Sequence, residues 1–154
     1  MKIITAPEPL KTTTPSIFLA GSIEQDVAER WQDQVIESLK DLPVTILNPR
    51  QASWDSSWKQ TIENPQFKEQ VTWELEALER ADIILLYFDP ITKSPISLLE
   101  LGLFAKSGKM MICCPKGFWR KGNVDIVCER YGIPQFDSLD IMIAVLKKSV
   151  LNES

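Results

Sequence analysis

The sequence predicts an α/β protein: a single-domain, three-layer sandwich of the Rossmann or flavodoxin-like kind, with a parallel sheet of about five strands. Short apolar runs alternate with helical segments, which is typical of a parallel sheet covered by helices on both faces. The run DIILLYF at 82–88 is continuously apolar, as expected of a strand buried on both sides. With 154 residues, the chain has the length of one domain.

Each expected element follows from its local pattern. The run SIFLAG ends at a glycine and predicts a strand, while Ser94-Pro95 combines an N-cap serine with a proline at the first helical position. Strands are expected at 16–21, 44–48, 82–88, 109–114 and about 133–136, and helices at 25–42, about 66–80, Pro95 to Gly108, about 123–131 and about 138–149. Residues 1–15, rich in Pro and Thr, are expected to form an extended lead-in to a domain at 16–150.

Composition narrows the function classes. The net charge of −4 argues against binding to a nucleic acid polymer, which needs a basic stripe. No apolar run reaches the roughly 18 residues of a membrane helix, and the N-terminus lacks a signal-peptide core, so we expect a cytoplasmic protein with no membrane partner. The absence of histidine excludes Ser-His and Cys-His nucleophile pairs and histidine-ligated zinc, so acid–base chemistry falls mainly to carboxylates. The cysteines are expected to be reduced core thiols: Cys113, Cys114 and Cys128.

The candidate binding segments follow the strands, because ligands of parallel sheets bind outside the carboxyl ends of the strands. These segments are Gly21-Ser22, 48–58, 89–97 (beginning at Asp89) and 115–123. In segment 48–58, Trp54 and Trp58 offer stacking faces for a base, although they could instead pack the loop against the domain or a partner. Hydrogen bonds to a base edge could come from Asn48, Arg50 and Asp55.

Two glutamates occupy positions where an apolar side chain is expected. In the helix at 66–80, Phe67, Val71 and Leu78 form an apolar stripe whose missing i+7 member is Glu74. In the next helix, Ile96, Leu99 and Leu103 form a stripe that Glu100 completes at i+4. The pattern therefore predicts two carboxylates that face the core or a cleft on either side of the strand at 82–88. Paired carboxylates are what glycosidic-bond chemistry requires.

Structural interpretations of both glutamates are also open. Ser97 and Glu100 match a capping box, although a helix that begins at Pro95 places Glu100 too deep to cap it. Glu74 could pair with Arg80 or Lys68, or face solvent if the stripe is shifted toward Leu75.

Four stretches, IFLAGSI, LNPR, FKEQVTWELEALERADIILLYFDP and SPISLLELGLFAKSGK, resemble in this order the nucleoside 2-deoxyribosyltransferase family, and most closely its nucleoside 2-deoxyribosyltransferase-like branch. The resemblance covers roughly residues 16 to 125. It implies that Glu100 is the nucleophile and that Glu74 stands where the family usually has an aspartate that contacts base or sugar. It places Phe18 near a family tyrosine that hydrogen-bonds the nucleophile, and Asn123 where a residue is lent to a neighbouring subunit.

Ser94 falls where transferases tend to have an aspartate for the sugar 5′-hydroxyl and where related 5′-monophosphate N-glycosidases have a phosphate-binding serine. The family implies transfer of 2-deoxyribose between nucleobases, no cofactor or metal, small-molecule nucleoside and nucleobase partners, and a homo-oligomer. Three alternatives stay open: hydrolysis of a 2′-deoxynucleoside or its 5′-monophosphate, a non-catalytic nucleotide-binding sensor, and a structural protein in which both glutamates are ion-paired. Phe18, which cannot donate a hydrogen bond, is the best support for a sensor.

Overall fold

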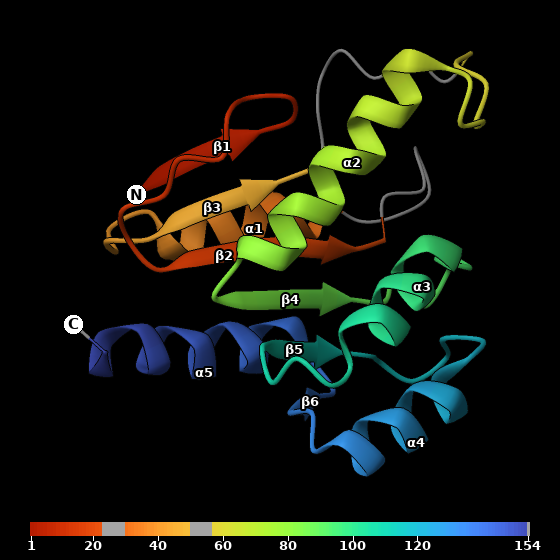
Figure 1. The fold of residues 1–154 in the computed structure, drawn as a ribbon. Coiled ribbons are helices and arrows are strands. Elements are labelled where there is room, and N and C mark those ends of the chain that lie inside the picture. The colour runs from red at the N-terminus through yellow and green to blue at the C-terminus, as the bar shows by residue number, and fades with distance from the viewer. Residues whose placement is uncertain (23–29, 50–56, 154) are drawn as a thin grey trace.

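The computed structural model describes residues 1–22, 30–49 and 57–153, and shows a six-stranded parallel sheet flanked by helices (Figure 1). The strand order across the sheet is β1-β3-β2-β4-β5-β6. The strands are β1 (Lys2–Thr5), β2 (Ser16–Gly21), β3 (Thr45–Asn48), β4 (Ile83–Tyr87), β5 (Met110–Cys113) and β6 (Gln135–Phe136). The helices are α1 (Trp31–Leu39), α2 (Pro65–Arg80), α3 (Pro95–Phe104), α4 (Lys121–Tyr131) and α5 (Leu139–Asn152).

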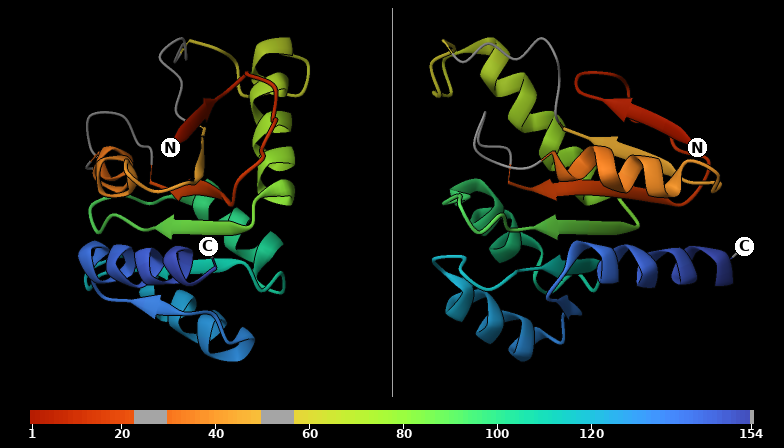
Figure 2. Two further views of the ribbon diagram at one scale, coloured as in Figure 1. Left: turned by 90° about the vertical axis from the view of Figure 1, so that its left-hand side faces the viewer. Right: turned by 180° about the vertical axis from the view of Figure 1, so that it is seen from behind.

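The predicted three-layer fold is confirmed. One core cluster lies under α2, α3 and α4, and a second lies under α1 and α5 on the opposite sheet face (Figure 2). The central strand β4 serves both clusters, because Ile84 and Leu86 point to the first and Leu85 to the second. This double burial is why the sequence of the strand is apolar throughout.

The sheet has one strand more than expected, because part of the lead-in forms β1. This strand pairs in parallel with β3, from Lys2 opposite Thr45 to Thr5 opposite Asn48. The segment that follows is held on α2, where the Trp73 indole donates a hydrogen bond to the Glu8 carbonyl at 2.8 Å. A four-residue edge strand with two exposed positions shows no clear alternation of apolar and polar residues, so the sequence alone does not predict it. It is recognised only from its pairing with β3.

Element boundaries differ in two places that bear on the site. Helix α3 ends at Phe104 rather than at Gly108, although Gly108 does adopt a positive φ of 72° in the following turn. The first part of the helix expected at 25–42 lies outside the described residues, and α1 is seen from Trp31. Within the described part of the chain, no helix combines the length and apolar character needed to cross a membrane.

The strand order has a topological switch point between β2 and β4. Without the edge strand β1, the strand order β3-β2-β4-β5-β6 is that of flavodoxin-like sheets. In such sheets the connections that follow the two strands corresponding to β2 and β4 run to opposite faces of the sheet. Connections from β2 and β4 therefore leave toward different faces. The general rule for open α/β sheets puts a ligand at the carboxyl ends of these two strands.

Candidate active site

The carboxyl ends of β2 and β4 are joined by a cluster of three hydroxyl groups. The Ser22 Oγ lies 2.6 Å from the Ser94 Oγ and 3.0 Å from the Thr92 Oγ1, and the latter two atoms are 2.7 Å apart. The Asp89 amide donates a hydrogen bond to the Ser22 Oγ at 2.8 Å. The structure thus brings Ser22, from the candidate segment Gly21-Ser22, together with Asp89 and Ser94, from the candidate segment 89–97.

Gly21 is required at this junction for steric reasons. A Cβ atom on Gly21 would lie 2.4 Å from the Tyr87 carbonyl oxygen and 2.9 Å from the Trp31 ring, and its φ of 134° is a conformation that L side chains rarely adopt. The glycine therefore lets β2 approach β4 closely enough for Ser22 to enter the hydroxyl cluster.

Ser94 begins helix α3, as predicted, with Pro95 at the first helical position. Its backbone is left-handed, at φ 46° and ψ 54°, and its hydroxyl makes no capping hydrogen bond. A non-glycine residue in this region costs roughly 1–2 kcal/mol. The conformation turns the Ser94 hydroxyl toward Ser22 and Thr92 instead of the first turn of its own helix.

Glu100 is buried on α3, with 8% of its surface exposed. Burial, and then repulsion from Glu74, raises the pKa of the Glu100 carboxyl from 4.5 to about 8. Within the described structure, no hydrogen bond joins Glu100 to Ser97, so the capping-box interpretation is not supported. At neutral pH the resting protein therefore holds a proton on Glu100.

Glu74 lies half-buried on α2, and its charge contributes to the raised pKa of Glu100. Burial raises the pKa of the Glu74 carboxyl, and a hydrogen bond from Gln70 opposes this increase. The Gln70 Nε2 donates to the Glu74 Oε1 at 2.9 Å and also to the Pro49 carbonyl at 2.9 Å. Among the described ion pairs, none joins Glu74 to Arg80 or Lys68.

The apolar stripe predicted on α3 faces the opposite way. Ile96, Leu99 and Leu103 are 56–58% exposed, whereas the buried positions of the helix are Ser97, Glu100 and Leu101. The prediction that Glu100 is buried is correct, but its reasoning is wrong. An apolar face of a helix at the edge of a domain does not by itself indicate the core, because another surface can cover it.

The remaining predicted residues take different places. Asn48 ends β3 and is nearly buried, Asn123 is exposed on α4, and Phe18 is fully buried among the apolar residues beneath α2 and α3. Segment 50–56, with Arg50, Trp54 and Asp55, lies outside the described residues, and Trp58 just after it is half-buried. The sequence analysis named neither Gln70 nor Thr92 individually, although Thr92 lies in the candidate segment 89–97. The only available signal for Gln70 was its position one helical turn before Glu74.

The segment after β5 is held by two sets of contacts. The Trp119 indole donates to the Lys93 carbonyl at 2.8 Å, and the cationic groups of Lys93 and Arg120 lie 4.5 and 4.4 Å from its ring centroid. This contact ties the start of α4 to the loop that precedes α3.

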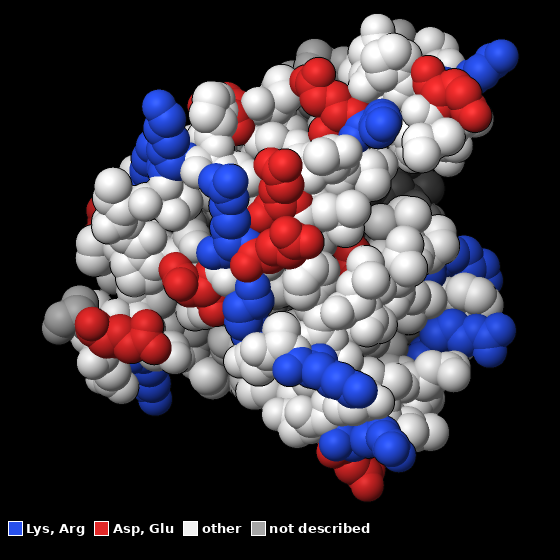
Figure 3. All heavy atoms as spheres, viewed as in Figure 1, with Lys and Arg blue, Asp and Glu red and all other residues white. Residues whose placement is uncertain are grey.

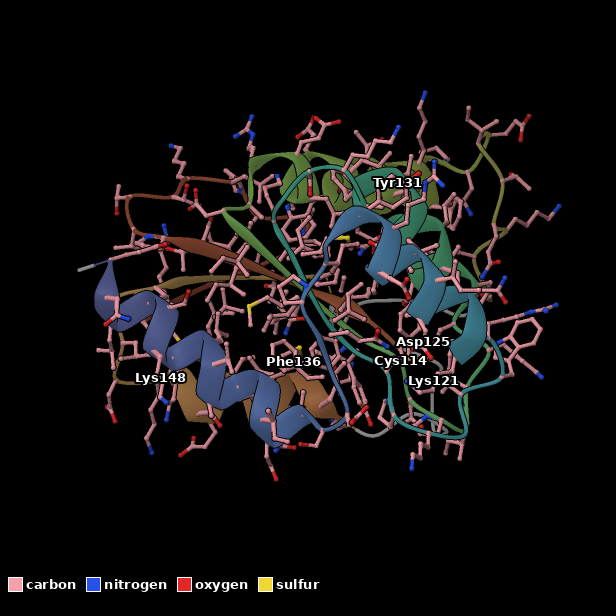
Figure 4. The ribbon with its side chains drawn as sticks, turned by 90° about the horizontal axis from the view of Figure 1, so that it is seen from below. Cys114, Lys121, Asp125, Tyr131, Phe136 and Lys148 are labelled. Atoms are coloured by element: carbon pink, nitrogen blue, oxygen red, sulfur yellow. The ribbon has the colours of Figure 1, made fainter. Side chains whose placement is uncertain are left out.

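Lys121 forms the second set of contacts. Its Nζ donates to the Cys114 carbonyl and to the Asp125 carboxylate, each at 3.0 Å (Figure 4). The start of α4, including Asn123, is thereby fixed relative to the end of β5.

Two other kinds of reactive group, metal-ligand clusters and cysteine thiolates, are absent from the described residues at neutral pH. No three His, Cys, Asp or Glu side chains among residues 1–22, 30–49 and 57–153 gather closely enough to hold a metal ion. The three cysteines are free and buried, and burial raises the pKa of Cys113 and Cys114 to about 12 and that of Cys128 to about 11. They are protonated thiols at neutral pH.

Comparisons with known proteins agree with this architecture. One solved structure, the crystal structure of a conserved protein from Enterococcus faecalis V583, superimposes with a TM-score of 0.62, and the match covers 88% of this chain and 99% of that chain. At 13% sequence identity, that similarity concerns the fold alone. A search of curated proteins found no match. The family model described as nucleoside 2-deoxyribosyltransferase like matches residues 14–118, a stretch that holds Glu74 and Glu100, and the chain therefore belongs to this family.

Proposed function

We propose that the protein is a nucleoside 2-deoxyribosyltransferase that cleaves the N-glycosidic bond of 2′-deoxynucleosides and transfers the sugar to another nucleobase. The observation that carries the proposal is the pair of glutamates, one buried and one half-buried, on consecutive helices of a protein that belongs to this family. Family membership points to glycosyl transfer or glycoside cleavage, and the chain has no histidine that could do the acid–base work. Two carboxyl groups supply what such a reaction needs.

The proposed transfer needs one ionised and one protonated carboxyl group, and the two glutamates can supply both. In the reactive form, Glu74 holds the proton and Glu100 is ionised. A Glu100 carboxylate oxygen attacks C1′, the bond from C1′ to the base nitrogen breaks, and the base takes both the bonding electron pair and the proton from Glu74. A second base then attacks C1′, the ester bond to Glu100 breaks, and the proton of the incoming base returns to Glu74. No redox partner is required.

Before substrate binds, the proton of the glutamate pair lies mainly on the wrong carboxyl for this mechanism. Because the pKa of Glu100 is about 8, the proton lies mainly on the nucleophile before substrate binds. Two interacting carboxyls titrate as a pair, and the proposed mechanism uses the form of the pair that retains one proton. The reaction draws on the minor arrangement, so activity should fall at low pH, where both glutamates are protonated, and at high pH, where neither is.

Hydrolysis of a 2′-deoxynucleoside 5′-monophosphate is the second candidate, and it involves the same glutamates. Its support is the group of hydroxyls at the N-terminal end of α3, where the Ser94 hydroxyl is turned away from its capping position. Hydroxyl donors beside the positive end of a helix suit an anion such as a phosphate.

We further propose a homo-oligomer in which a second copy covers the outward face of α3 and brings its Asn123 to the neighbouring site. Apart from Glu100, which is buried, this helix carries no charged residue, and the area over α3 is largely uncharged in Figure 3. Gly102 on the same helix has open space around its Cβ position, so no contact among the described residues requires a glycine that costs helix stability. Leu99→Lys should reduce the molar mass measured by light scattering, and an unchanged mass would contradict the proposed contact.

A direct assay distinguishes these functions. The protein is incubated with 2′-deoxyadenosine or its 5′-monophosphate, with and without a second base, and bases and nucleosides are separated by chromatography. Base exchange identifies a transferase, free base alone a hydrolase, and binding without turnover a sensor. Exchange should disappear in Glu100→Ala and fall strongly in Glu74→Ala, while Glu76→Ala, at an exposed position on α2, should behave as the wild type. Wild-type turnover in Glu100→Ala would refute the mechanism.

A further inference from the structure

We propose that Gln70 is a positioning residue for the reaction, and that its side-chain amide holds the Glu74 carboxyl in place and favours the ionised form of this carboxyl over the protonated form. This inference rests on the proposed function for its kinetic consequences, but its structural part stands independently of any activity. Gln70 lies on α2, one helical turn before Glu74, and only 5% of its surface is exposed.

The orientation of the Gln70 amide is determined by its partners. The Pro49 carbonyl can only accept a hydrogen bond, so the NH₂ group of Gln70, and not its oxygen, must face it at 2.9 Å. The second hydrogen of the same NH₂ group then points to the Glu74 Oε1, also at 2.9 Å. Both donors are used, and neither contact survives a flip of the amide. Gln70 thus ties Glu74 to the backbone immediately after β3.

These contacts make the two glutamates unequal. Glu74 accepts a hydrogen bond that favours its ionised form, whereas no hydrogen bond to the Glu100 carboxyl is seen among the described residues. Glu100 of α3 is the titratable group in the described structure that interacts with Glu74, and the end of β3 contributes the neutral Pro49 carbonyl. The hydrogen bond from Gln70 therefore contributes to the difference between the two carboxyls, beside the deeper burial of Glu100.

A purely structural role of Gln70 predicts a different effect of its replacement on the titration of Glu74. If Gln70 served only to satisfy the Pro49 carbonyl and to stabilise α2, its loss would lower stability without changing the titration of Glu74. If Gln70 controls Glu74, its loss should raise the titration midpoint of Glu74 even in a fully folded protein. The two roles are separable by measuring the titration directly.

The test is a carbon-13 NMR titration of the glutamate carboxyls in the whole protein, with Glu74→Gln and Glu100→Gln used for assignment. In Gln70→Met, which keeps the length of the side chain and removes both donors, the Glu74 midpoint should rise by about one pH unit or more. Gln66→Met, the same exchange at an exposed position one turn earlier, should leave it unchanged. An unchanged Glu74 midpoint in folded Gln70→Met would overturn the inference.

A second variant guards against misfolding. Gln70→Leu also removes both donors but has a shorter, branched side chain, so the Glu74 midpoint should rise in this variant too. If Gln70→Met does not fold, an unchanged midpoint in Gln70→Leu overturns the inference instead.

The kinetic arm links the inference to function. In an active enzyme, Gln70→Met should move the acidic limb of the kcat profile to higher pH, because without the amide the glutamate pair takes up its second, inactivating proton at higher pH. The variant should change KM less than kcat. A wild-type protein without turnover would refute the proposed function, while the NMR titration would still decide the role of Gln70. An active Gln70→Met whose acidic limb is unmoved would refute the positioning role.

Discussion

Replacement of Glu100 by glutamine should remove a pH dependence from the stability of this protein. In the unfolded chain the Glu100 carboxyl loses its proton near its ordinary pKa of 4.5, whereas in the folded protein burial and Glu74 hold the pKa at about 8. Between these values the folded state binds more protons, so the free energy of unfolding falls as pH rises. Below pH 4.5 and above pH 8 this contribution no longer changes with pH.

The magnitude follows from the two pKa values. A difference of about 3.5 units between 4.5 and about 8, at 1.36 kcal/mol per unit, corresponds to about 5 kcal/mol of stability lost across this range. Such a loss is comparable to the total stability of many domains, which is about 5–15 kcal/mol. The wild-type protein should therefore be most sensitive to denaturant at the alkaline end of the range.

The assay is urea denaturation between pH 5 and pH 9, followed by tryptophan fluorescence. The stability of the wild type relative to Glu100→Gln should fall steadily with pH, because glutamine fills the same space and does not titrate. Glu76→Gln, an exposed position on α2, should retain the wild-type dependence. Parallel stability curves for the wild type and Glu100→Gln would show that Glu100 is not held protonated in the folded state, and would refute the reasoning.

Three further outcomes concern the framework of the site. Gly21→Ala should lower the free energy of unfolding by about 3–5 kcal/mol in urea titrations, because it adds a clash with Tyr87 to an unfavourable φ; a loss below about 1 kcal/mol would contradict the close approach of β2 and β4. Asn64→Ala should cost about 1 kcal/mol, since the Asn64 side chain accepts hydrogen bonds from two amides at the start of α2, and an unchanged urea midpoint would argue against this cap. The three buried thiols should react with a thiol reagent slowly in the native protein and rapidly in urea; fast native labelling would contradict their burial.

The sequence by itself determined most of the fold, and it singled out Glu100 as a carboxylate in apolar surroundings. The alternation of apolar and helical segments specifies the elements, since the periods of strands and helices are local properties of the chain. Five of the six strands were expected, and Ser94-Pro95 marked the start of α3. A carboxylate among large apolar neighbours, at Glu100, stands out in the sequence alone because burying an unpaired charge is costly.

Only the tertiary structure decided what each of these residues touches. The sequence showed that α3 has an apolar face, but the packing turned that face outward and left Glu100 buried beside Ser97 and Leu101. Ser22 and Ser94 meet across 72 positions of the chain, and β1 exists through its pairing with β3. The orientation of the Gln70 amide is set by the Pro49 carbonyl, which lies 21 positions away in the chain. Such contacts depend on which elements become neighbours, and a local period carries no information about that choice.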